Sequence, residues 1–247
     1  METTVHEIAQ DVYRLSTCIP DAAPGGFTFN QYLVDADEPL LFHTGARQLF
    51  ELVGPAIERV LPLARLRWIS FGHYESDECG AMNSVLAEAP HAEVAFNALG
   101  CMVSVADMAD RPPRVLTDGE VLDLGGHRLR VITTPHVPHG WEAQVLFDET
   151  TSTLFSGDLF TQIGEPPALV HDIDLVTPSV EAEDMFGFTC PTANTAPTIR
   201  RLAELSPRTI ALMHGPAFAG DCAAALHGLA DAYADRFSAT LDAVVVR

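Results

Sequence analysis

The stretch His73-Tyr74-Glu75-Ser76-Asp77-Glu78 places one imidazole and three carboxylates within six residues. It directly follows a largely apolar run, residues 68–71, which is typical of a buried strand. Side chains in an extended segment alternate sides, so positions 73, 75 and 77 can point the same way. So many ionisable groups in one place are unfavourable unless a positive charge lies among them. The stretch therefore predicts a metal site.

Matching candidates occur farther along the chain, each after a short apolar run. Loops that follow the carboxyl ends of strands are where such folds place their ligand sites. An aspartate between two histidines in the sequence, Asp158, is suited to bridge two cations, because each of its oxygens can serve one ion. The candidate metal ligands are, in order, His73, Glu75, Asp77, His136, Asp158 and His214.

These six candidates divide into three imidazoles and three carboxylates. A structural zinc site usually closes at four ligands, often with cysteine. Replacing imidazole by carboxylate makes a site harder and shifts its preference from zinc toward iron or manganese. We therefore expect a site for two metal ions, with iron or manganese preferred to zinc.

The remaining histidines need separate interpretations. His139 follows His136 within the segment 135–140, and we favour His136 as the ligand because it comes first after the strand. His43 and His171 could support a ligand through hydrogen bonds. We interpret the others as surface residues or hydrogen-bonded core residues: His6, His91, His127 and His227.

The composition excludes several classes of partner. The chain has 247 residues, is 47% hydrophobic and carries 14 Lys+Arg against 34 Asp+Glu, a formal net charge of -20. Nucleic acids and anionic membranes bind basic surfaces, so neither is an expected partner. No apolar run is long enough for a transmembrane helix, and residues 1–20 lack the pattern of a signal peptide. The five cysteines are scattered and form no CxxC pair, which predicts a reducing, cytoplasmic location.

The pattern of hydrophobic and turn residues predicts alternating blocks of strands and helices. We expect strands at 11–15, 29–34, 40–42, 67–71, 94–96 and 209–213, two strand pairs within 121–132 and 144–155, and helices at 47–61, 79–89, 197–205 and 221–241. No linker or repeat interrupts them. We therefore expect one domain, residues 1–247, with two sheets packed between helical layers.

The series HxExD, then His, Asp and His, resembles the metallo-β-lactamase superfamily over nearly the whole chain. Most hydrolases of that superfamily have HxHxDH, and Glu75 in place of the second His matches the flavodiiron branch. The resemblance implies an α/β fold, the four-layer αβ/βα sandwich. It also implies one iron held by His73, Glu75 and His136, with the second iron held by Asp77 and His214 and with Asp158 as the bridge.

Two features refine the resemblance. Flavodiiron proteins generally have His after the Asp, whereas this chain has Glu78, which could give the second iron an oxygen ligand or leave that position to water. The segments 77–83 and 156–160 resemble the corresponding segments of stand-alone oxygen-binding diiron proteins, which lack the flavodoxin domain. The chain ends at Arg247 and has no glycine-rich phosphate loop, so we expect no flavin in it. Flavodiiron proteins form head-to-tail homodimers because the flavin of one subunit must approach the iron of the other. Without a flavin this reason is missing, so a homodimer is possible but not required.

We therefore expect a non-haem diiron protein that binds or reduces dioxygen or nitric oxide. It would act as a carrier, as a sensor with a signalling partner, or as a reductase with an external electron donor. The alternative is a dinuclear metallohydrolase of phosphodiesters, thioesters or lactams, against which Glu75 argues. Candidate pocket residues are the aromatic side chains Phe27, Phe29, Tyr74, Trp141 and Phe160.

Overall fold

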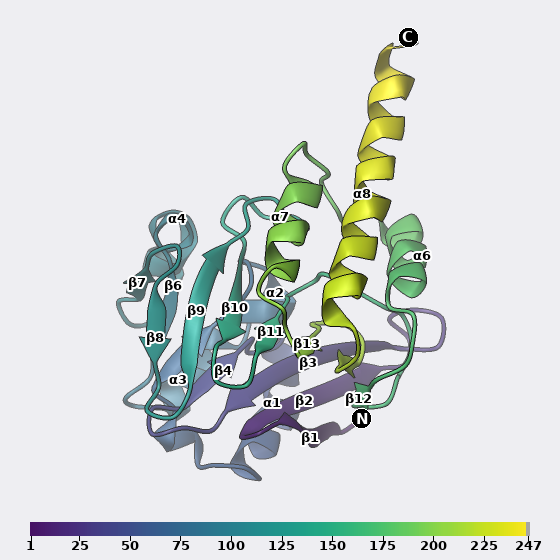
Figure 1. The fold of residues 1–247 in the computed structure, drawn as a ribbon. Coiled ribbons are helices and arrows are strands. Elements are labelled where there is room, and N and C mark those ends of the chain that lie inside the picture. Colours follow the sequence, from purple (N-terminus) through teal and green to yellow (C-terminus); the bar gives the residue numbers. More distant parts are fainter. Residues whose placement is uncertain (246–247) are drawn as a thin grey trace.

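The computed structural model describes residues 1–245, which form two seven-stranded sheets (Figure 1). The first sheet consists, in spatial order, of β1 (Thr3–Ala9), β2 (Val12–Ile19), β3 (Phe27–Val34), β4 (Leu40–Phe42), β5 (Trp68–Ser70), β6 (Glu93–Asn97) and β7 (Arg114–Leu116). The second consists of β12 (Leu169–Val170), β14 (Ala217–Phe218), β13 (Thr209–Ala211), β11 (Thr153–Phe155), β10 (Gln144–Asp148), β9 (Arg128–Thr133) and β8 (Val121–Asp123).

Apolar side chains of the two sheets pack against each other. The Phe155 ring of β11 contacts Tyr32 of β3 and Phe42 of β4, with ring centroids 5.7 and 5.5 Å apart. These three side chains are buried, as are Leu129 and Leu146 from the second sheet. Burial of this shared layer is what holds the sheets face to face.

Helices cover the outer face of each sheet. α1 (Phe50–Glu58) and α3 (Met82–Glu88) bury their apolar sides against the first sheet. α7 (Thr195–Ala203) and α8 (Cys222–Val245) cover the second, in green and yellow in Figure 1, and α6 (Val176–Phe186) contacts α8. Shorter helical turns are η1 (Arg47–Leu49), η2 (Leu63–Arg65), α2 (Ser76–Cys79), α4 (Ala98–Gly100), η3 (Cys101–Val105) and α5 (Ala106–Met108). The predicted four-layer sandwich is therefore confirmed.

The order of the strands brings distant loops to one edge of the sandwich. β4 pairs with β5, and β11 with β13, in parallel, so the carboxyl ends of each pair meet at the same edge. The loops that follow these strands contain His43, His73, Asp158 and His214. None of the helices within residues 1–245 is long and apolar enough to cross a membrane.

Several element predictions need correction. The expected helix 47–61 is the short turn η1 followed by α1, and residues 76–79 form a helical turn where an irregular loop was expected. The edge strand β1 and the helix α6 were not predicted. Segment 176–186 contains Pro178 and has few apolar residues at helical spacing, so its sequence pattern is weak.

A buried ion pair fastens the hairpin of β8 and β9 to β10. His127 Nδ1 lies 2.8 Å from Asp148 Oδ2, and both side chains are buried. The interpretation of His127 as a hydrogen-bonded core residue is therefore confirmed. The hydrogen bond to Asp148 raises the pKa of His127. Burial alone would raise the pKa of Asp148, but hydrogen bonds from His127, Thr151 and Thr150 lower it below its ordinary value.

These shifts set the pH range in which the pair stabilises the fold. The contribution of His127 is complete below its unfolded pKa of about 6.5 and is lost as pH rises through the raised folded value. The contribution of Asp148 is complete above about pH 4 and is lost as pH falls through its lowered folded value. We expect His127→Gln to lower the free energy of unfolding most near pH ~5.5, by roughly 2 kcal/mol, and less above pH ~8. Urea unfolding at several pH values measures this, and His227→Gln at an exposed position is the control. A difference that does not change with pH would contradict the expectation.

Candidate metal centre

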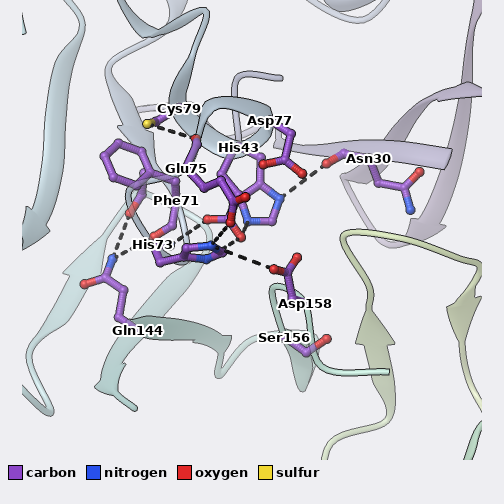
Figure 2. Close-up of polar contacts among 12 residues, drawn as sticks. Asn30, His43, Phe71, His73, Glu75, Asp77, Cys79, Gln144, Ser156 and Asp158 are labelled. Atoms are coloured by element: carbon purple, nitrogen blue, oxygen red, sulfur yellow. Dashed lines mark hydrogen bonds and ion pairs between the residues drawn. The ribbon is translucent and has the colours of Figure 1, made fainter. Parts of the chain in front are cut away.

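Four side chains from distant parts of the chain converge on one point. His73, Glu75, His139 and Asp158 each offer a ligand atom, and these atoms lie within 4.8 Å of one another. The Nε2 atom of His139 lies 2.9 Å from His73 Nε2, 3.2 Å from Glu75 Oε2 and 3.3 Å from Asp158 Oδ2. Figure 2 shows His73 pointing toward Glu75 and Asp158. This group could hold a metal ion, because imidazole nitrogens and carboxylate oxygens gathered this closely favour a cation among them.

A second group adjoins the first. His214 Nε2 lies 3.3 Å from Asp77 Oδ2 and 3.4 Å from Asp158 Oδ1. The two oxygens of Asp158 therefore face different groups, with Oδ2 toward His139 and Oδ1 toward His214. Asp158 lies where a carboxylate between two cations would lie.

The donor set fits metal ions. Asp77 Oδ1 and Asp158 Oδ1 are buried, and neither has a hydrogen-bond partner among residues 1–245. A buried carboxylate oxygen without a donor is unfavourable, and a cation removes that cost. Five of the six predicted ligands meet in these two groups: His73, Glu75, Asp77, Asp158 and His214.

The structure brings His139 to the converging ligand atoms instead of the preferred His136. His136 is exposed, adopts a positive φ of 62° and donates its backbone N–H to Gly140 O at 2.8 Å. This turn directs the first histidine after β9 outward and brings the second one inward. Gly140 has φ 79°, and a Cβ there would lie 3.1 Å from His73 Cβ. Gly140 thus permits the close approach of the loops that carry His73 and His139. A glycine directly after His139 is the feature of the sequence that could have indicated His139 as the ligand.

The other candidates lie outside the two groups. His171 is exposed, and its Nδ1 lies 3.1 Å from Ala219 O, away from the converging ligand atoms. Glu78 and His43 are fully buried on the far side of the His73 ring. Glu78 Oε1 lies 3.2 Å from His73 Nδ1 and 3.3 Å from His43 Nε2. Glu78 therefore faces the nitrogen of His73 that is turned away from the converging ligand atoms.

The first sheet positions the loop that carries His214. Asn30 Nδ2 donates to Leu212 O and Gly215 O, both at 2.8 Å, and the Tyr32 hydroxyl donates to Leu212 O at 2.6 Å. The His214 Nδ1 atom lies 2.8 Å from Thr28 O, which leaves Nε2 free to face Asp77 and Asp158. The ring also stacks on Phe27, with centroids 4.4 Å apart. Strand β3 thus fixes both the place and the orientation of this imidazole.

The opposite charges in the cluster shift each other's pKa. Burial alone would lower the pKa of His73, but Glu78, Glu75 and Asp158 raise it to about 12. In the same way, Asp158 and Asp77 overcome the effect of burial and raise the pKa of His214 to about 10. Hydrogen bonds with His139 and His73 lower the pKa of Glu75 to about 2. The imidazoles balance the carboxylates as cations, a task that metal ions perform when the ligands bind them.

An aromatic cavity of about 300 Å³ opens onto both groups. Phe27 and Phe29 line it, as predicted, together with Phe186 and Phe188, which were missed because segment 176–188 gave no clear pattern. The other three aromatic predictions were wrong. Tyr74 lines a different cavity, Trp141 is 53% exposed, and Phe160 is buried in the core of the second sheet.

Comparison with known proteins agrees with this geometry. A family model described as ODP family beta lactamase matches residues 27–215. The chain belongs to this family. A diflavin flavoprotein A 1 from Synechocystis sp. is 26% identical over 210 residues, which cover 82% of this chain and 36% of that protein. The chain thus spans about a third of the length of the curated relatives that it matches.

Solved structures share the fold. Rubredoxin oxygen:oxidoreductase from the anaerobe Desulfovibrio gigas has a TM-score of 0.81 at 21% identity, covering 93% of this chain and 61% of that one. A metal-soaked flavodiiron core from Synechocystis sp. has a TM-score of 0.77 at 24% identity, covering 96% and 61%. The expected metallo-β-lactamase-like fold is therefore confirmed, and flavodiiron cores are among the structures that share it.

The His139 correction is testable by metal titration. We expect His139→Ala to weaken the binding of Co²⁺ by more than the roughly 10–100-fold that is typical when a group behind a ligand is removed. The visible absorption of bound Co²⁺ reports the affinity. His136→Ala is the matched control, because that imidazole is three residues away and exposed. Weaker binding in His136→Ala with unchanged binding in His139→Ala would reverse the assignment.

Proposed function

We propose that this chain is a non-haem diiron protein that binds and reduces dioxygen or nitric oxide. The observation that carries the proposal is the position of Asp158 between two donor groups, one of which contains Glu75. Three imidazoles and three carboxylates form a hard donor set, which suits iron better than zinc. The printed names of the similar structures, a flavodiiron core and an oxygen oxidoreductase, support this choice.

In this proposal the residues have distinct tasks. His73, Glu75 and His139 would hold the first iron, whereas Asp77 and His214 would hold the second. Asp158, which faces both groups, would serve both ions. When bound, two ferrous ions would supply one electron each to a diatomic molecule.

The surrounding side chains shape the space for that molecule. Phe27 stacks on His214 and contacts Phe186 edge to face, with ring centroids 5.6 Å apart. Phe188 contacts the His139 ring, with centroids 5.8 Å apart. These rings give the cavity apolar walls, which admit a small uncharged molecule and limit the entry of water.

Sustained reduction requires electrons from elsewhere. The relatives that the chain matches are about three times as long, and their flavoprotein names point to a flavin in the whole protein. Here we assign electron delivery to an external donor in the cytoplasm. Without that donor the chain would bind the diatomic molecule and act as a carrier or sensor. A metallohydrolase has less support, because Glu75 adds negative charge where a hydrolytic site carries a neutral imidazole.

The direct test is an optical spectrum. Protein loaded anaerobically with two equivalents of Fe²⁺ should develop a visible absorption band when air is admitted, because oxidised iron with carboxylate ligands absorbs where ferrous iron does not. Asp158→Ala, which removes the shared ligand, should not develop the band, and His136→Ala should. Confirmed loading with two irons and no band in the wild type would instead favour hydrolysis and call for a screen of ester and phosphodiester substrates.

A further inference from the structure

Glu78 is a fully buried carboxylate whose polar neighbours belong to two histidines. Its Oε2 atom accepts the backbone N–H of His73 at 2.6 Å. Its Oε1 atom lies 3.2 Å from His73 Nδ1 and 3.3 Å from His43 Nε2. A buried carboxylate is costly unless such partners surround it, so each of these contacts matters for where the side chain lies.

The two nitrogens of His73 face opposite environments. Nε2 lies 2.7 Å from Glu75 Oε2 within the converging ligand atoms, and Nδ1 faces Glu78. An imidazole that gives Nε2 to a metal ion keeps its remaining proton on Nδ1. Glu78 Oε1 lies 3.2 Å from Nδ1, is buried and has no hydrogen-bond donor among residues 1–245, so it is the acceptor that this proton would take. That hydrogen bond would fix the tautomer and the orientation of the ring.

The surroundings confine the Glu78 carboxylate to this place. A Cβ at Gly72 would lie 3.0 Å from both of its oxygens, so an alanine there would make the carboxylate shift by a few tenths of an ångström. His43 Nδ1 lies 3.3 Å from Asn30 O (Figure 2). The His43 ring also packs against Phe42, with ring centroids 4.1 Å apart. A continuous chain of contacts therefore runs from β3 through His43 and Glu78 to His73.

The charge of Glu78 also matters to the ions in the proposed centre. Two ferrous ions bring four positive charges, and the carboxylates of Glu75, Asp77 and Asp158 bring three negative charges. Glu78 supplies the fourth. A buried negative charge this close to the ions stabilises their more highly charged, oxidised state.

We propose that Glu78 is a positioning residue: through Nδ1 of His73 it fixes the orientation of that ligand, and its charge favours the oxidised centre. This inference rests on the proposed diiron function for its redox part. Its positioning part concerns any metal ion that His73 binds through Nε2.

The test compares two buried carboxylates of the same region. Glu78→Gln keeps the size of the side chain and removes its charge. Glu142→Gln is the matched control, because Glu142 is also buried and its Oε1 accepts the Tyr74 N–H at 2.9 Å, a bond to the same loop. We expect the affinity for the first equivalent of Co²⁺ to fall about 10–100-fold in Glu78→Gln and to change little in Glu142→Gln. In the iron-loaded proteins, the midpoint potential should rise in Glu78→Gln relative to Glu142→Gln.

Two further measurements do not depend on a folded Glu78 variant. In zinc-loaded wild-type protein, nitrogen-15 NMR should place the His73 proton on Nδ1, with the strong downfield shift of a hydrogen bond to a carboxylate. Gly72→Ala, which displaces the carboxylate without removing a charge, should also weaken Co²⁺ binding. A His73 proton on Nε2, or equal losses of affinity in Glu78→Gln and Glu142→Gln, would overturn the inference.

The outcomes separate this inference from the proposed function. A wild-type protein that binds metal with the expected His73 tautomer, yet gives no oxygen-dependent band, would remove the diiron function and leave the positioning role. If Glu78→Gln instead keeps the oxygen-dependent band and shows unchanged Co²⁺ affinity and unchanged midpoint potential, the diiron function stands and the positioning role of Glu78 is lost.

Discussion

The carboxylate of Asp158 is the constraint on which the site depends. It is only 7% exposed, and its two oxygens face imidazoles from different directions, His139 at 3.3 Å and His214 at 3.4 Å. His73 lies in the loop after β5 of the first sheet, and Asp77 lies in the helical turn α2 that follows it, whereas Asp158, His139 and His214 come from loops of the second sheet. Ions held among these residues would bind both halves of the sandwich at once, so metal binding and the packing of the sheets stabilise each other.

The sheets meet through two kinds of contact, and the site needs both. Between the sheets, aromatic and aliphatic side chains exclude water but do not set a unique register. At the edge, buried polar side chains of β2 and β3 bind main-chain oxygens of the His214 loop: Arg14 Nη2 donates to Gly215 O at 2.8 Å, beside the bonds from Asn30 and Tyr32. Because these bonds are directional, they define where His214 lies relative to Asp77.

Sequence reasoning found the residues whose position follows from a strand end. His73, Asp158 and His214 lie in loops directly after β5, β11 and β13. Parallel pairing brings the ends of β11 and β13 together, and the packing of the two sheets brings the end of β5 to the same edge. Sequence reasoning failed where a loop turns before it reaches the site, because the number of residues after a strand does not show in which direction a side chain points. His136 and His139 differ only in how the turn closed by Gly140 directs them. It also failed for Phe186 and Phe188, whose position depends on α6 packing against α8 rather than on any local pattern.

The two glutamates at positions 75 and 78 act on the same imidazole from opposite sides. Glu75 Oε2 lies 2.7 Å from His73 Nε2, and Glu78 Oε1 lies 3.2 Å from His73 Nδ1. A hydrolytic centre needs ions that polarise water, which neutral imidazole ligands allow by leaving the positive charge of the ions uncompensated. A centre that gives up electrons needs ligands that compensate the positive charge of the ions, because negative charge near the ions stabilises their oxidised state. Both departures from the HxHxDH motif add negative charge at His73, so in the proposed diiron centre they would favour electron transfer over hydrolysis.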